Sequence, residues 1–189
     1  MGVKDLFRLD GKVALVTGGS RGLGLRMAEA LTEMGCRVAI TARKEAELAE
    51  ARAHLEGAWG GEVETVAGDL SKFETIPVLV DRVVQRFGDI DILVNNAGAT
   101  WGAPAEEYPD AAWHKVMNLN VNAICPGWFH SRMADGLIDK LGPEMVARVP
   151  LRRIGGEEDL KGAVVFLASE ASRHVTGQAL VVDGGAALV

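Results

Sequence analysis

The sequence contains few cysteines, histidines and tyrosines, and each scarcity excludes a class of protein or limits a reaction. Its two cysteines, Cys36 and Cys125, lack the spacing of a disulfide framework and suit a reducing compartment. Its four histidines are isolated from one another, so no metal-ligand pattern is present and we expect no metal site. A reaction that uses a tyrosine hydroxyl has one candidate residue, Tyr108.

The sequence also lacks an excess of positive charge and any long hydrophobic run. The formal net charge is −6 and the pI is about 5.3, which argues against binding to nucleic acid or to an anionic membrane. No apolar run is long enough to cross a bilayer, and the first residues carry no apolar segment of a signal peptide. We therefore expect a globular α/β protein of the cytoplasm, without a nucleic-acid or membrane partner.

Short apolar runs alternate with amphipathic segments over the first hundred residues. Strands are predicted at 12–18, 37–43, 62–69 and 91–98, and helices at 22–34, 44–56 and 71–87. Because only short connections separate them, the pattern predicts an α/β fold with a doubly wound parallel sheet, the Rossmann arrangement. The later chain predicts a helix at 111–121, a strand at 121–125, an irregular stretch at 126–156, a helix at 157–168 and a strand at 179–185. We expect one domain over 1–189, with a substrate lid at about 128–156.

A glycine-rich turn, TGGSRGLG, follows the first predicted strand and opens the first predicted helix. In a doubly wound sheet, such a turn places helix N-terminal amides against the phosphates of a ligand. Gly18 would permit the tight turn, Gly22 a close approach to pyrophosphate, and Gly24 close packing of helix on sheet. The context favours dinucleotide binding over a purely structural turn. The expected contacts come from Gly18, Ser20, Arg21, Gly22, Leu23 and Gly24.

The end of the second predicted strand indicates which dinucleotide is bound. NAD-binding proteins usually carry an acidic residue there, whereas arginine accommodates the 2′-phosphate of NADP. Arg43 stands at this position, and Arg21 adds a second cation from the glycine turn. A guanidinium is permanently charged and can bind two phosphate oxygens at once. The pattern favours NADP(H), although two ordinary surface arginines would produce the same sequence.

Several motifs together resemble the short-chain dehydrogenase/reductase superfamily. They are the Thr-Gly-x-x-x-Gly-x-Gly pattern at 17–24, Gly68-Asp69-Leu70, Asn95-Asn96-Ala97-Gly98, Pro126-Gly127 and the tail at 166–185. They occur in the superfamily's order, and the resemblance extends from about residue 8 to residue 187.

The resemblance implies roles for residues along the chain. Asp69 and Leu70 would line the adenine pocket, although Asp69 could instead cap a helix. Asn95, Ala97 and Gly98 would lie beside the cofactor ribose, and Asn95 could instead tie neighbouring strands together. The residues expected around the nicotinamide carboxamide are Pro126, Gly127 and Ser131. Asn120 matches the helix asparagine that supports a proton relay in this superfamily.

The sequence departs from the superfamily in its catalytic residues. The resemblance calls for a tyrosine as general acid/base, a lysine four residues later and a serine that orients the substrate carbonyl. The residue four positions after Tyr108 is Ala112, and Tyr108 precedes the helix that contains Asn120. We therefore interpret Tyr108 as a loop or substrate-rim residue, and the catalytic serine, tyrosine and lysine are missing from the sequence.

The stretch NLNVNAICPG at 118–127 indicates where the missing residues belong. A predicted helix meets a predicted strand there without any glycine, proline or turn between them. In the superfamily two crossover units, roughly 60 residues, separate the segments that match on either side. The block is therefore missing between Val121 and Asn122. Three explanations stay open: the printed sequence omits a segment, the segment was lost by deletion or an assembly error, or the protein is a non-catalytic nucleotide binder completed by another chain.

The resemblance implies an NADP(H)-dependent oxidoreductase that transfers hydride between nicotinamide and a ketone or secondary alcohol. The most similar members are 3-oxoacyl-(acyl carrier protein) reductases and gluconate 5-dehydrogenases, so a 3-oxoacyl thioester or a sugar acid is the expected substrate. An apolar pocket, or else only lid packing, is expected from Trp101, Trp128, Phe129 and Met133. A catalytically inactive binding protein is the alternative. A homo-oligomer, tetramer or dimer, is also expected by resemblance.

Overall fold

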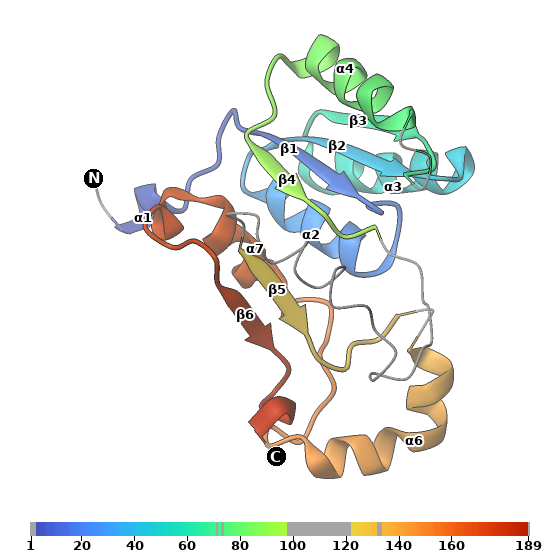
Figure 1. Cartoon of the computed structure of the whole chain (residues 1–189), viewed down its shortest axis with the longest axis vertical. Helices are drawn as coiled ribbons and strands as arrows, with labels where there is room; N and C mark the ends of the chain where they lie inside the picture. The colour runs from blue at the N-terminus through green and yellow to red at the C-terminus, as the bar shows by residue number, and fades with distance from the viewer. Residues whose placement is uncertain (1–2, 71, 73, 98–121, 132–133, 189) are drawn as a thin grey trace. The chain divides into compact units, whose positions relative to one another are not determined.

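The computed structural model covers all 189 residues and describes residues 3–70, 72, 74–97, 122–131 and 134–188. The chain forms two compact units (Figure 1). The first unit is Met1–Gly98 with Glu157–Ala171, and the second is Ala99–Gly156 with Ser172–Val189. This division does not test whether the chain folds as one domain, so the single domain with a lid at about 128–156 stays a prediction.

The first unit contains a four-stranded parallel sheet in the order β3-β2-β1-β4. Its strands are β1 (Val13–Thr17), β2 (Arg37–Ala42), β3 (Val63–Ala67) and β4 (Ile92–Val94). Val13 of β1 is paired with Arg37, and Ala14 is paired with Ile92. Every residue of β1 is buried, as expected of a strand covered on both faces. The predicted doubly wound parallel sheet is therefore confirmed.

Helices cover both faces of this sheet (Figure 1). On one face, α4 (Thr75–Phe87) packs Leu79, Val83 and Phe87 against alternate residues of the strands, including Val13 and Leu15. On the other face lie α2 (Gly22–Glu33) and α3 (Glu45–Trp59). The short helices α1 (Val3–Leu6) and η2 (Glu170–Ser172) lie near the ends of the unit's two sequence segments. Among the described residues, no helix is long and apolar enough to cross a membrane.

A buried carboxylate connects the two sequence segments of the first unit. Glu29 of α2 is only 1% exposed and accepts hydrogen bonds from Arg26 at 2.6 Å and His54 at 2.8 Å. Lys161, the first residue of α7 (Lys161–Ala168), lies 3.5 Å from the second oxygen of Glu29. Arg26 also binds Glu157. A carboxylate this deeply buried requires such partners, so the network positions α7 against α2.

The outer strand β4 differs from its neighbours in length and exposure. It is three residues long, it pairs with β1 alone among the described strands, and Leu93 is 57% exposed. A central strand of a parallel sheet would be paired on both edges and buried on both faces. The exposed edge is therefore consistent with a missing strand next to β4. The predicted strand at 91–98 was too long, because pairing with one neighbour supports only Ile92–Val94.

The second unit contains a separate pair of parallel strands, β5 (Ala123–Pro126) and β6 (Ala179–Val182). Gly127 donates its amide to Val182, and Asn122 donates to the carbonyl of Val175 and accepts from the amide of Gln178. The unit also contains α6 (Asp135–Arg148) and the short η3 (Ala186–Leu188). The helix α6 lies in the stretch that the sequence indicated as irregular.

Candidate functional site

The glycine turn crosses the carboxyl end of the sheet in the first unit. Gly18 follows β1 with φ at +66°, a conformation that favours glycine. The amides of Gly18 and Gly19 donate to the carbonyl of Thr41, at 2.8 and 3.2 Å. These hydrogen bonds therefore tie the turn to the end of β2, next to Arg43.

Two glycines of this turn lie where no side chain would fit. A Cβ atom on Gly24 would lie 2.2 Å from the Gly18 oxygen and 2.4 Å from the Asn96 side chain. A Cβ atom on Gly19 would lie 2.7 Å from the side chain of Ile40. Gly22, by contrast, has φ at +55° and open space where its Cβ would be. Gly24 thus allows the turn to pack closely, whereas Gly22 leaves the first turn of α2 accessible to a ligand.

The N-terminus of α2 has the features of an anion site. Arg21 stands at the N-cap position without a side-chain capping bond, and the first turn contains no acidic residue. The first amides of a helix lack intrahelical partners and carry partial positive charge. Ser20 is buried beside them. This end of α2 can therefore hold a phosphate with backbone amides.

Asn96 holds the end of β4 against the glycine turn. Its side-chain amide donates to the carbonyls of Thr17 and Gly18 at 3.0 and 3.2 Å. The Thr17 hydroxyl accepts from the amides of Asn96 and Ala97, both at 2.9 Å. Asn96, and not Asn95, thus ties the end of β4 to the neighbouring turn. The Asn95 residue is exposed, and the pair Asn-Asn alone could not reveal which amide faces the turn.

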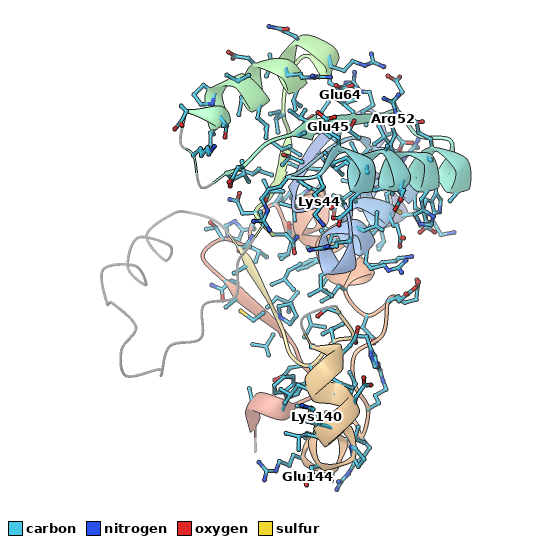
Figure 2. All side chains as sticks on the ribbon, turned by 90° about the vertical axis from the view of Figure 1, so that its right-hand side faces the viewer. Lys44, Glu45, Arg52, Glu64, Lys140 and Glu144 are labelled. Carbon is cyan, nitrogen blue, oxygen red and sulfur yellow. The ribbon has the colours of Figure 1, made fainter. Side chains whose placement is uncertain are left out.

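Three cationic residues lie on the connections that follow β1 and β2. Arg21 donates to Glu47 at 3.1 Å, and Lys44 donates to the same oxygen at 3.0 Å. Arg43 is exposed at the end of β2. Figure 2 shows Lys44 and Glu45 at the start of α3. The structure thus brings the two predicted arginines to one edge of the sheet and adds Lys44 and Glu47, which the sequence reasoning missed.

The neighbouring strand ends supply the rest of this edge. The Thr41 hydroxyl is buried and has no hydrogen-bond partner among the described residues. The carbonyl of Asp69 accepts from the Thr75 hydroxyl at 2.9 Å. The helix α4 begins at Thr75, so the predicted start at residue 71 was wrong. Leu70 packs against the core beneath α4. The adenine-pocket roles of Asp69 and Leu70 stay predictions.

The second unit contains the other predicted contacts. A Cβ atom on Gly127 would lie 2.5 Å from the Asp183 side chain, so Gly127 permits close contact of the two strand ends. The Ser131 hydroxyl accepts from the Ala134 amide, and Asp135 accepts from the Ser131 amide, so Ser131 is bonded to the start of α6. The exposed Trp128 is available to a ligand, whereas Phe129 is buried over Gly155. Of the two expected roles, an apolar pocket or lid packing, the burial of Phe129 favours packing.

Five residues with predicted roles lie outside the described part of the chain: Gly98, Trp101, Tyr108, Asn120 and Met133. Among the described residues, no group of three or more histidine, cysteine or acidic side chains is placed to hold a metal ion.

Comparison with known families identifies the group to which the chain belongs. The family model described as short chain dehydrogenase matches residues 12–128. This chain is a member of the short-chain dehydrogenase family. Its members are oxidoreductases. A second model, described as Enoyl-(Acyl carrier protein) reductase, matches residues 118–187. The two matches overlap at 118–128, the stretch that contains the unpunctuated joint.

Individual relatives of this short-chain dehydrogenase match along almost the whole chain. A 2-dehydro-3-deoxy-D-gluconate 5-dehydrogenase of Escherichia coli is 32% identical, and the match covers 97% of this chain and 98% of the relative. A rhamnolipids biosynthesis 3-oxoacyl-(acyl-carrier-protein) reductase of Pseudomonas aeruginosa is 28% identical, with 95% and 97% covered. The structure of a gluconate 5-dehydrogenase from Burkholderia cenocepacia, solved with NADP and tartrate, is 27% identical, with a TM-score of 0.85 over 100% of both chains.

The length of one match indicates how many residues of a relative have no counterpart in this short-chain dehydrogenase. The Escherichia coli relative aligns over 252 residues, although 97% of the 189-residue chain is only about 183 residues. About 69 aligned positions (252 minus 183) therefore have no counterpart in this chain. This difference agrees with the roughly 60 residues that two crossover units would supply. Its location between Val121 and Asn122 stays a prediction.

Proposed function

We propose that this chain binds NADP(H) and is the nucleotide-binding part of an oxidoreductase acting on a ketone or secondary alcohol. The observation that carries the proposal is the uncapped start of α2, with Arg21 beside it and Gly22 leaving it open. A phosphate group needs this combination of free amides and positive charge. The NADP in the related gluconate 5-dehydrogenase supports the choice of cofactor.

Each part of the cofactor has candidate contacts in the chain. The amides at Ser20, Gly22 and Leu23 would face the pyrophosphate, with Gly18 forming the turn beneath it, and Arg21 and Arg43 would bind the 2′-phosphate. Asp69 and Leu70 would contact adenine, while Asn95, Ala97 and Gly98 would contact ribose. Pro126, Gly127 and Ser131 would hold the nicotinamide carboxamide, with Trp128 at the substrate side. When bound, the cofactor would exchange a hydride with a carbonyl carbon.

Proton transfer is the step that the chain does not supply for itself. Tyr108 is its only tyrosine, and Ala112 stands where a partner lysine would be needed. Without a positioned acid/base, the rate falls by about 10²–10⁴-fold. We infer that the 189-residue chain binds NADPH but needs the absent block to turn over substrate. The alternative function, a catalytically inactive dinucleotide-binding protein, would also bind NADPH.

For the substrate we favour a 3-oxoacyl thioester or a similar ketone. The apolar face of Trp128 supports this class, and so does the likeness to the 3-oxoacyl-(acyl-carrier-protein) reductase of Pseudomonas aeruginosa. A sugar acid such as gluconate is the second candidate, supported by the two gluconate-type relatives. We further propose that the protein is cytoplasmic and forms a homo-oligomer. Size-exclusion chromatography with light scattering would test the oligomeric state.

One experiment tests the function and separates it from its alternative. NADPH absorbance at 340 nm is followed with a 3-oxoacyl thioester and, separately, with a ketogluconate. The chain is compared with a variant that carries the additional block of the Escherichia coli relative between Val121 and Asn122. We expect turnover only with the block inserted. An intact mass near 20.1 kDa confirms that the unmodified chain was used. A block-containing, folded variant that binds NADPH without turnover on either substrate class would contradict the proposal.

Cofactor choice has its own test at Arg43. Replacing Arg43 by alanine should weaken NADPH binding about tenfold while changing NADH binding little, because only NADPH carries the 2′-phosphate. Arg52→Ala is a matched control, since Arg52 is an exposed arginine of α3 paired with Glu56 (Figure 2). Fluorescence titration measures both affinities. An equal loss for NADPH and NADH would refute the phosphate role of Arg43.

A further inference from the structure

Glu47 holds two of the cations at the expected 2′-phosphate position. Its Oε1 atom lies 3.1 Å from Nη1 of Arg21 and 3.0 Å from Nζ of Lys44. Arg21 comes from the turn before α2, and Lys44 from the residue before α3. One carboxylate oxygen thus bridges the two connections that line this edge of the sheet.

The exposure of the three side chains shows which group an incoming anion would meet. The Glu47 side chain is 22% exposed, whereas those of Arg21 and Lys44 are 47% and 68% exposed. The carboxylate is therefore less accessible to solvent than the two cations that it binds. A phosphate that reaches Arg21 and Lys44 from solvent would meet donors already engaged with an anion. It would also approach the negative charge of Glu47 itself.

We propose that Glu47 is a specificity-determining residue that competes with the cofactor's 2′-phosphate for Arg21 and Lys44. The inference rests on the proposed binding of NADP(H). With NADPH, the phosphate must share or displace the Glu47 contacts, and like-charge repulsion opposes its binding. With NADH, the carboxylate keeps both cations, so their charge remains neutralised in part. Glu47 therefore narrows the preference for NADPH over NADH.

The size of the effect follows from the exposure of the pairs. Each exposed ion pair contributes about 0.2–1 kcal/mol, and every 1.36 kcal/mol corresponds to a tenfold change in affinity. Removing the carboxylate releases two such pairs and the repulsion. We expect Glu47→Gln to bind NADPH about three- to tenfold more tightly, with NADH affinity changed less than about twofold. The gain should shrink as salt rises, because exposed charges are screened.

The experiment measures NADPH and NADH dissociation constants for the full chain and its variants by fluorescence titration. Glu45→Gln is the control, because it removes the same charge from the first turn of α3. A second test introduces Glu47→Gln into a variant that already carries Arg21→Gln. The gain in NADPH affinity from Glu47→Gln should be smaller there than in the wild type, because one of the two ion pairs is already absent. Circular dichroism verifies that each variant is folded.

The outcomes separate this inference from the proposed function. A selective gain in NADPH affinity for Glu47→Gln, larger than that for Glu45→Gln, supports the competition. No change, an equal gain in both variants, or a loss of NADPH affinity would overturn it. A loss would mean that Glu47 orders the two cations for phosphate binding. If the wild-type chain binds neither dinucleotide, the proposed function is refuted, and the competition with it.

Discussion

Replacing Glu29 by glutamine should destabilise the protein more than any exposed charge substitution of α3. The side chain of Glu29 is buried among Arg26, His54 and Lys161. Glutamine has nearly the same shape but cannot neutralise the charges of Arg26 and Lys161. The substitution therefore removes one partner of a buried network while leaving the others in place.

The magnitude follows from the surroundings of the remaining cations. Breaking a fully buried ion pair by removing one partner costs about 3–5 kcal/mol. Here the side chains of Arg26 and Lys161 are 27% and 17% exposed, and they also bind Glu157 and Glu158. Part of their charge thus stays solvated and paired. We expect a loss in the free energy of unfolding of about 2–3 kcal/mol.

Urea unfolding followed by far-ultraviolet circular dichroism measures this loss. Glu56→Gln is the matched control, because Glu56 pairs with Arg52 on the exposed side of α3. Such a helix-surface pair contributes about 0.3–0.5 kcal/mol. Hydrogen exchange should also show the amides of α7 losing protection first in Glu29→Gln, since Lys161 begins that helix. Equal stability of the two variants would refute the argument.

Two further predictions concern the termini of the strands and the cysteines. A hydrogen bond from Lys12 and, to a smaller extent, one from a β1 amide lower the pKa of Asp91. The stabilisation of the fold by the Asp91 carboxylate is therefore present above the unfolded pKa of about 4 and is lost as the pH falls. Asp91→Asn should therefore cost about 1–2 kcal/mol near pH 7 but almost nothing near pH 2, and an equal cost at both values in acid unfolding curves would contradict this. Burial raises the pKa of the Cys36 thiol to about 12, so an aromatic disulfide reagent at pH 8 should label the exposed Cys125 alone until the chain unfolds. Rapid labelling of both thiols in the folded protein would show that Cys36 is accessible.

The first three strands and the glycine turn could be predicted because their signals are local. The run from Val13 to Val16 is apolar at every position, which suits a strand buried on both faces. A glycine after that run allows the positive φ that the turn at Gly18 requires. These features depend on neighbours in the sequence, so a single sequence contains them.

Helix boundaries in the later chain were harder to predict. The helix α6 contains Gly136, Gly142 and Pro143, residues that disfavour helix, and the stretch therefore looked irregular. Ser131 forms hydrogen bonds with Ala134 and Asp135 at its start, which sequence spacing alone did not distinguish from a loop. The helix α4 begins at Thr75, four residues later than predicted.

The amino-acid sequence alone was sufficient for the parallel fold, the family and the absence of the tyrosine and lysine pair. These conclusions rest on residue types, local periodicity and motif order. The tertiary structure alone decided that Asn96 is the amide tying β4 to the turn, that Glu29 joins α7 to α2, and that Glu47 pairs with both Arg21 and Lys44. These contacts join residues from different elements, and their distances and burial arise only when the elements pack together.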